Sequence, residues 1–231
     1  MKSERIRLWD LPTRIFHWSL VLCVLAAIIT GKLGGNAMVW HGRIGLVIVG
    51  LITFRLVWGL NGPTYARFAQ FLPTPRRVFA SLGGRWQGIG HNPLGALSIF
   101  AMLAILAALL ATGIAGNDDI AFRGPLFELA GKDSSDRLIG WHRKLTSVLI
   151  LLLVLHLLAI AYYSRLKREN LVRPMLTGWK DVPAPLAAPT RGGGPRAFVL
   201  ALALALAAVY TASGHWLPAP PPAPAQQAPA W

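Results

Sequence analysis

Hydrophobic positions along the chain gather into five long blocks separated by short polar segments. The blocks lie at residues 15–31, 44–60, 94–115, 138–163 and 197–213, and residues 145–164 and 197–213 contain no Asp, Glu, Lys or Arg. An apolar run of about 20 residues matches the hydrocarbon thickness of a lipid bilayer. The pattern therefore predicts an all-α integral membrane protein, with a four-helix transmembrane bundle and an additional C-terminal transmembrane helix.

The spacing of the blocks divides the chain into four parts. The first four spans predict one four-helix domain over residues 1–180, followed by a Pro/Gly-rich linker at 181–196. The segment 197–216 contains the fifth span, 197–213, which is almost only Ala, Leu and Val. This composition predicts a lone, lipid-facing anchor. Residues 217–231 are rich in Pro and Ala, a composition that cannot bury a core and predicts a disordered or extended tail.

Composition narrows the class of protein further. The 231 residues are 54% hydrophobic and 14% charged, against roughly 25% charged in an average soluble domain, which argues against a water-soluble enzyme. The net charge of +14 is not concentrated on a polar domain, so we expect contact with membrane lipid and no nucleic-acid partner. The single cysteine, Cys23, excludes a disulfide framework and covalent haem attachment through Cys-x-x-Cys-His.

The first span is expected to be retained and not cleaved as a signal peptide. Lys32 and Leu33 follow it, at the place where a signal peptide would have small residues.

The charges of the connecting segments predict the orientation. Residues 1–14 carry four basic and two acidic side chains, residues 61–90 four basic and none acidic, and residues 164–196 seven basic and two acidic. Residues 115–137 carry three basic and five acidic side chains, and residues 32–43 two basic ones. By the positive-inside rule, the N-terminus, the second loop and residues 164–196 face the cytoplasm of a multi-pass protein in the cell inner (cytoplasmic) membrane.

Four histidines fall at two depths of the predicted bundle. His142 and His156 are 14 residues apart in the fourth span, which returns them to nearly the same helix face with a rise of about 21 Å. His17 lies at the cytoplasmic start of the first span and His41 at the outer start of the second. Antiparallel packing then pairs His17 with His156 near the cytoplasm and His41 with His142 near the outer face.

Two facing imidazoles at one depth are the axial ligands of a six-coordinate haem b, which apolar helix faces enclose. A zinc site needs its ligands close together, whereas these histidines are divided between depths about 20 Å apart. All nine carboxylates lie in terminal and loop segments, which gives little support to a transporter. The histidines therefore predict two haems b and electron transfer across the membrane.

Arg55 is the cation whose position needs an anion most. It follows His41 by 14 residues, so it shares the direction of His41 but lies at the inner depth. A cation inside a membrane is costly without an anionic partner. We assign Arg55 to a propionate of the inner haem.

Three further residues are candidates for cofactor binding. Arg14 lies about one turn before His17, and Arg143 follows His142, so both are candidate propionate partners; ordinary interfacial anchoring explains them equally well. His91 opens the third span at the cytoplasmic depth, where it is a candidate for binding a quinone or a propionate. The alternative for His91 is an interfacial helix cap.

Four motifs between residues 5 and 180 resemble the bacterial cytochrome b561 family, which overlaps with the b-type cytochrome subunits of nickel-iron hydrogenases. They are Trp9-Asp10-Leu11-Pro12-Thr13-Arg14 with Phe16-His17-Trp18, His41-Gly42 leading to Phe54-Arg55-Leu56-Val57-Trp58-Gly59, Gly90-His91-Asn92-Pro93-Leu94-Gly95, and Glu169-Asn170-Leu171-Val172-Arg173-Pro174-Met175. The resemblance implies a four-helix membrane cytochrome with two haems b, whose ligands fall on His17, His41, His142 and His156. The fifth span and the Pro-rich tail are not part of the family pattern.

The resemblance implies respiratory electron transfer between the quinone pool and a partner redox protein, such as a cytochrome c. The alternative function is that of a membrane-anchoring b-type cytochrome subunit of a hydrogenase or another dehydrogenase complex. Bis-histidine irons have no open position for oxygen, so any catalysis would be quinone oxidoreduction at a haem edge.

Overall fold

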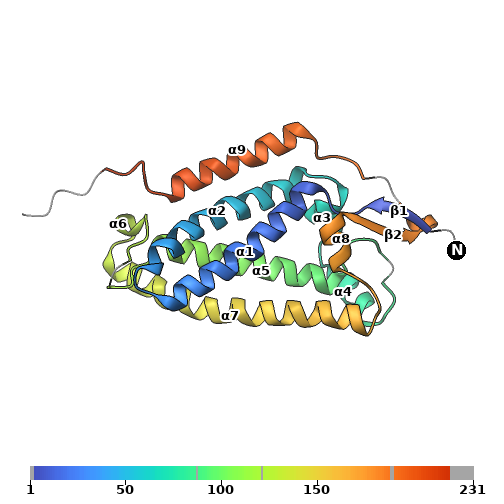
Figure 1. The fold of residues 1–231 in the computed structure, drawn as a ribbon, viewed down its shortest axis with the longest axis horizontal. Coiled ribbons are helices and arrows are strands. Elements are labelled where there is room, and N and C mark those ends of the chain that lie inside the picture. Colours follow the sequence, from blue (N-terminus) through green and yellow to red (C-terminus); the bar gives the residue numbers. More distant parts are fainter. Residues whose placement is uncertain (1–2, 87, 121, 188–189, 219–231) are drawn as a thin grey trace, which may run out of the picture.

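A computed structural model describes residues 3–86, 88–120, 122–187 and 190–218. Five helices in it are long and apolar enough to cross a membrane: α1 (Leu11–Leu33), α2 (Ala37–Asn61), α5 (Pro93–Ile114), α7 (Lys132–Arg165) and α9 (Pro195–Ala212). The shorter elements are β1 (Ser3–Arg7), η1 (Thr64–Ala66), α3 (Phe68–Phe71), α4 (Pro75–Leu82), α6 (Phe127–Ala130), α8 (Val172–Thr177), β2 (Trp179–Pro183) and η2 (Ala184–Leu186). The five predicted spans are confirmed as helices, and four of them form an elongated bundle (Figure 1).

Apolar side chains from all four bundle helices meet in one core. Its buried members are Val24 of α1, Ile48 and Ile52 of α2, Leu103, Leu106 and Leu109 of α5, and Leu149 of α7. Most other large apolar side chains point outward, as expected where lipid replaces water around the bundle. Leu149 is seven residues from both His142 and His156 along α7, so this part of the core lies between the two histidines of that helix.

Local sequence fixes where the third span begins. Asn92 is the N-cap of α5, and its side chain accepts a hydrogen bond from the Gly95 backbone N–H at 2.6 Å. Pro93 occupies the first helical position, where its missing N–H costs no hydrogen bond. Asn92 and Pro93 thus set the position of His91 immediately before the helix.

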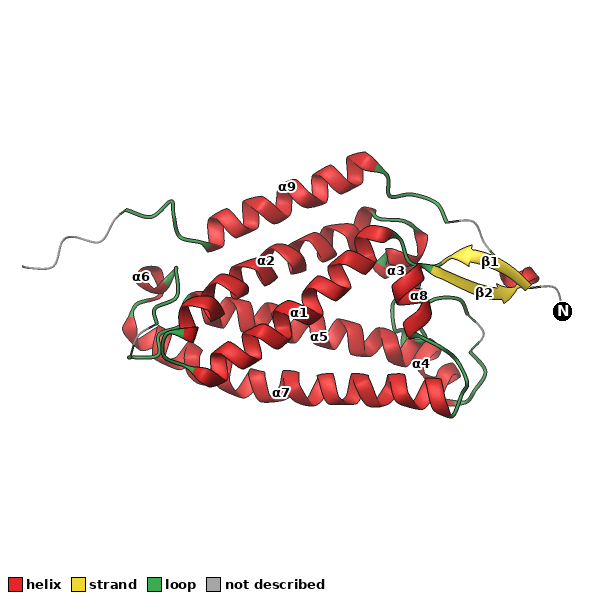
Figure 2. Ribbon diagram, viewed as in Figure 1, coloured by secondary structure: helices red, strands yellow, loops and turns green. Residues whose placement is uncertain are grey.

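Two short strands depart from the all-α prediction. β1 pairs antiparallel with β2, from Ser3 opposite Pro183 to Arg7 opposite Trp179, and the pair lies at the end of the bundle where the chain begins (Figure 2). The backbone N–H groups of Leu8 and Trp9 both donate to the Gly178 carbonyl, at 2.8 and 3.1 Å. The two ends of the four-helix domain are therefore joined next to the start of α1.

The fifth span is not the lone anchor that its composition predicts. α9 runs alongside α2 (Figure 1), with Ala201 and Ala205 buried between the two helices. The ring of Phe198 meets the rings of Phe54 and Trp58 edge-on, at 5.8 and 6.2 Å. Because the small alanines let the backbones approach closely, α9 becomes a fifth member of the bundle.

The described part of the predicted linker at 181–196, residues 181–187 and 190–196, is also more ordered than its composition suggests. Its first residues complete β2, and Thr190 donates to the Arg7 carbonyl at 2.9 Å. Thr64 donates through its backbone N–H and its hydroxyl to the Arg191 carbonyl, at 2.8 and 3.0 Å. The segment therefore docks on the loop after α2. The predicted tail, 217–231, lies outside the described residues from position 219 onward.

Candidate functional site

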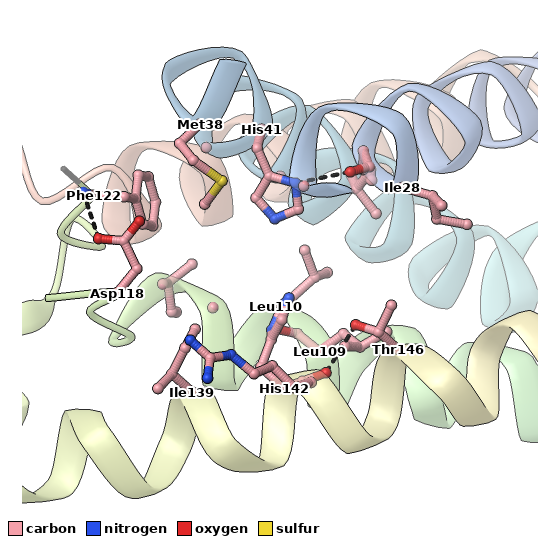
Figure 3. Close-up of a pocket in the computed structure, with 18 of the residues that line it drawn as sticks. Ile28, Met38, His41, Leu109, Leu110, Asp118, Phe122, Ile139, His142 and Thr146 are labelled. Atoms are coloured by element: carbon pink, nitrogen blue, oxygen red, sulfur yellow. Dashed lines mark hydrogen bonds between the residues drawn. The ribbon is translucent and has the colours of Figure 1, made fainter. Parts of the chain in front are cut away.

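His41 and His142 meet at the end of the bundle opposite the strands. His41 lies in the second turn of α2 and His142 in the third turn of α7, and their ring centres are 6.1 Å apart with the planes at 77°. Figure 3 shows the two side chains entering one cavity from opposite sides. The structure thus brings together the predicted outer pair.

Both outer imidazoles are oriented by the same kind of hydrogen bond. Nδ1 of His41 lies 2.9 Å from the Ala27 carbonyl of α1, and Nδ1 of His142 lies 3.0 Å from the Leu109 carbonyl of α5. A carbonyl only accepts, so Nδ1 carries the proton in each ring. The lone pair of each neutral imidazole is then on Nε2, the nitrogen left free to bind a metal.

Each outer histidine packs against a glycine of the neighbouring helix. A Cβ on Gly31 would lie 3.0 Å from Nδ1 of His41, and one on Gly113 would lie 3.1 Å from Cε1 of His142. Both distances are shorter than an ordinary van der Waals contact. The two glycines therefore allow the imidazoles to lie flush against α1 and α5.

The cavity between the outer histidines has a volume of about 410 Å³, within the usual range for cofactor pockets. Its walls are mainly apolar and include Val24, Ile48 and Leu106. The charged side chains that line it are the cations Lys32 and Arg143 and the carboxylate Asp118. A haem b needs two opposed imidazoles, an apolar enclosure and cations for its propionates. The residues present fit that group.

The inner pair, His17 of α1 and His156 of α7, lies at the opposite end of the bundle. The two half-buried imidazoles are close enough to interact electrostatically. Nδ1 of His17 is buried and has no hydrogen-bond partner among the described residues, which leaves a polar atom available to a ligand. His156 follows His142 by 14 residues of one continuous helix, so the two depths are about 21 Å apart.

Arg55 lies at this inner end and is 4% exposed. One guanidinium nitrogen donates to the Ala66 carbonyl at 3.1 Å, and the guanidinium carbon lies 4.5 Å from the ring centre of Phe68. It also interacts electrostatically with Asp10. Arg55 therefore supports the loop after α2, a contact that the sequence did not indicate.

Arg14 joins the start of α1 to α8. One of its guanidinium nitrogens donates to the Leu176 carbonyl, whereas its Nε is buried without a hydrogen-bond partner among the described residues. The indole of Trp18 donates to the Met175 carbonyl at 3.3 Å. Met175 is the last residue of the fourth family motif, so the hydrogen bond from Trp18 joins that motif to α1.

His91 is held between two aromatic rings. Its ring centre lies 4.5 Å from those of Trp9 and Phe71, and it lines a second cavity of about 250 Å³. Burial, with smaller contributions from Arg55 and His17, lowers the pKa of His91 to about 3, so the ring is neutral at physiological pH. Its Nδ1 has no hydrogen-bond partner within the described part of the chain.

The prediction from sequence missed several residues around the outer cavity. Gly31, Gly113 and Thr112 contact the histidines, and Phe122 of the loop after α5 covers Gly42. Lys32 lines the cavity together with Arg143. A Thr-Gly pair ends the apolar run of the first span, and another lies two residues before the end of the third; this repetition was the available signal.

Comparison with known proteins agrees with this geometry. The family model described as prokaryotic cytochrome b561 matches residues 8–178. A probable Ni/Fe-hydrogenase B-type cytochrome subunit of Azotobacter vinelandii is 24% identical over 217 residues, covering 78% of this chain and 90% of that protein. A probable Ni/Fe-hydrogenase 1 B-type cytochrome subunit of Escherichia coli K12 is 24% identical over 179 residues, covering 58% and 73%. No solved structure matches the chain significantly.

The family match covers well over half of the chain and spans all four helices of the bundle. Membership of this family implies haem b as the cofactor and electron transfer as the role, and the opposed outer histidines suit both. The chain therefore belongs to the prokaryotic cytochrome b561 family and is a multi-pass membrane cytochrome of the b type.

Proposed function

We propose that this cytochrome holds two haems b and passes electrons between the quinone pool and a partner redox protein. One haem lies between His41 and His142, and the other between His17 and His156. Each haem, when bound, supplies a one-electron ferric/ferrous couple.

The observation that carries the proposal is the geometry of the outer pair. Metal–imidazole bonds are about 2 Å long, so two imidazoles on opposite sides of one metal ion have ring centres about 6 Å apart. The rings of His41 and His142 are 6.1 Å apart, and both keep Nε2 free because Nδ1 is hydrogen-bonded to a carbonyl. The rise of about 21 Å from His142 to His156 leaves room for a second, separate site.

The protein's own groups orient the cofactors and keep water away. The carbonyls of Ala27 and Leu109 hold the outer imidazoles in place, and the apolar core shields the space between the two depths. Arg143 is the proposed propionate partner at the outer site, where it lines the cavity. Arg55 and Arg14 are the proposed partners at the inner site, because Arg55 is buried and Nε of Arg14 is buried without a hydrogen-bond partner among the described residues.

His91 is the proposed contact for a quinone. The cavity that it lines also has Phe71 and Trp86 on its walls, which suit a planar ring, and the unpartnered Nδ1 of His91 is available to a quinone oxygen. His91 interacts electrostatically with His17, so this cavity is next to the proposed inner haem. The quinone would therefore exchange electrons at the cytoplasmic depth.

We further propose a hydrogenase as the redox partner, with a cytochrome c as the alternative. The relatives named above are described as hydrogenase cytochrome subunits, which supports the anchoring function as well. The positive-inside rule supports an inner-membrane location with the N-terminus in the cytoplasm. Co-purification of the tagged chain with hydrogenase subunits from its native membrane would support the first partner, and co-purification with a cytochrome c the second.

Haem content tests the proposal directly. The full chain, purified in detergent, is expected to contain two haems b per polypeptide by pyridine haemochrome assay, and His41→Ala to contain one. The matched control is His215→Ala, which changes an exposed histidine beyond α9 and is expected to retain both haems. One haem or none in the unmodified chain would refute the dihaem proposal.

A further inference from the structure

The outer histidines are held by two segments that repeat each other in sequence. The segments are Ala26-Ala27-Ile28-Ile29-Thr30-Gly31 in α1 and Ala108-Leu109-Leu110-Ala111-Thr112-Gly113 in α5. In each, the carbonyl that accepts the hydrogen bond from histidine comes four residues before the glycine that contacts the ring. One turn of helix therefore presents both contacts on the same face.

The threonine before each glycine makes the same backbone contacts. The Thr30 hydroxyl lies 2.7 Å from the Ala26 carbonyl and 3.2 Å from the Ala27 carbonyl. The Thr112 hydroxyl lies 2.8 Å from the Ala108 carbonyl and 3.0 Å from the Leu109 carbonyl. Such a bond to the preceding turn is common for threonine in a helix, so these contacts by themselves are structural.

One contact distinguishes the two segments. The Thr112 hydroxyl oxygen also lies 3.2 Å from Nδ1 of His142, whereas the hydrogen bond described for Nδ1 of His41 is to the Ala27 carbonyl. Since the Thr112 hydroxyl proton is directed at the carbonyls of its own helix, its oxygen accepts from Nδ1 of His142. His142 therefore shares its proton between Leu109 and Thr112.

We propose that Gly31 and Gly113 are positioning residues of the outer haem site, and that Thr112 makes His142 the more strongly electron-donating of the two ligands. This inference rests on the proposed outer haem. An additional acceptor on Nδ1–H raises the basicity of the imidazole, and a more basic ligand stabilises ferric iron. Thr112 thus lowers the potential of the outer haem by acting through His142.

Thr112→Val removes the acceptor and keeps the size and branching of the side chain. We expect the midpoint potential of the outer haem to rise and that of the inner haem to stay unchanged in an optical redox titration of the purified full chain. Thr112→Ser keeps the hydroxyl and is expected to restore the original potential. Thr30→Val is the matched control, because it removes an equivalent helix contact without a contact to histidine, and it is expected to leave both potentials unchanged.

The glycines give a second test by another measurement. Gly113→Ala places a methyl group 3.1 Å from Cε1 of His142, and Gly31→Ala places one 3.0 Å from Nδ1 of His41. Both variants are expected to weaken axial ligation, seen as a high-spin component in the ferric spectrum of the outer haem. The control is Gly140→Ala in α7, where a Cβ would meet nothing within 4 Å, and it is expected to stay low-spin.

The outcomes separate this inference from the proposed function. Two haems with an outer potential that is the same in Thr112→Val as in the unmodified chain would overturn the role of Thr112. An equal shift in Thr30→Val would overturn it as well, because the effect would then come from the helix. Absence of a haem that depends on His41 and His142 in the unmodified chain would instead contradict the proposed function.

Discussion

At the scale of single residues, the orientation of the outer histidines depends on groups that belong to other helices. The 14-residue spacing of His142 and His156 indicates a shared face, and the structure places His41 opposite His142. The carbonyls of Ala27 and Leu109, which orient the imidazoles, leave no mark in the sequence because every residue has a carbonyl. Their role as haem ligands stays a prediction from geometry and family.

Arg55 is the residue whose replacement is expected to cost most stability at the inner end. Arg55→Leu leaves the Ala66 carbonyl without its donor and removes the contact with Phe68, a loss of about 1–3 kcal/mol in the free energy of unfolding. Thermal unfolding of the detergent-solubilised chain measures it. Arg76→Leu is the control, since Arg76 is exposed, and a loss as large there would contradict this role for Arg55.

At the scale of elements, hydropathy predicted the spans but not where the helices begin. α7 starts at Lys132 and α2 at Ala37, ahead of the predicted starts at 138 and 44, because helices continue through the polar interface where hydropathy is low. The β1–β2 pair was not predicted, since its strands are five residues each and are separated by most of the chain. Backbone pairing over such a separation leaves no local pattern.

The packing of α9 against α2 was also not predicted from the sequence, for a different reason. A helix made almost only of Ala, Leu and Val is apolar on every side, so no polar face marks the side that faces lipid. The buried side is set by small residues, Ala201 and Ala205, which fit against α2. The same composition is therefore compatible with a lone anchor and with a bundle helix.

Ala201 gives a direct test of this packing. Ala201→Leu forces a larger side chain between α2 and α9, where Ala201 is 0% exposed, and is expected to cost about 1–3 kcal/mol in the free energy of unfolding. Ala203→Leu makes the same change on the exposed side of α9 and is expected to have little effect. Equal thermal unfolding temperatures for the two variants would argue for a lone anchor.

At the scale of the whole molecule, the bundle separates two sites by the length of its helices. The outer histidines and their cavity lie at one end, whereas His17, His156, Arg55 and His91 lie at the other, beside the strands. The basic excess of the chain falls on the segments at the second end. This distribution underlies the proposed orientation, with the first site outward.

Cysteine labelling checks that orientation. In a Cys23→Ser background, Ile120→Cys is expected to react with a membrane-impermeant maleimide in spheroplasts, because Ile120 is 90% exposed in the loop after α5. Arg76→Cys, in α4 of the segment that connects α2 and α5, is expected to react only after the membrane is permeabilised. The opposite pattern would reverse the orientation.

The central claim is that two pairs of histidines hold two haems at two depths. An optical redox titration of the four His→Ala variants of the purified full chain tests it most directly. We expect His41→Ala and His142→Ala to lose one and the same spectral component, and His17→Ala and His156→Ala to lose the other. Loss of the same component in His17→Ala and His41→Ala would contradict the pairing.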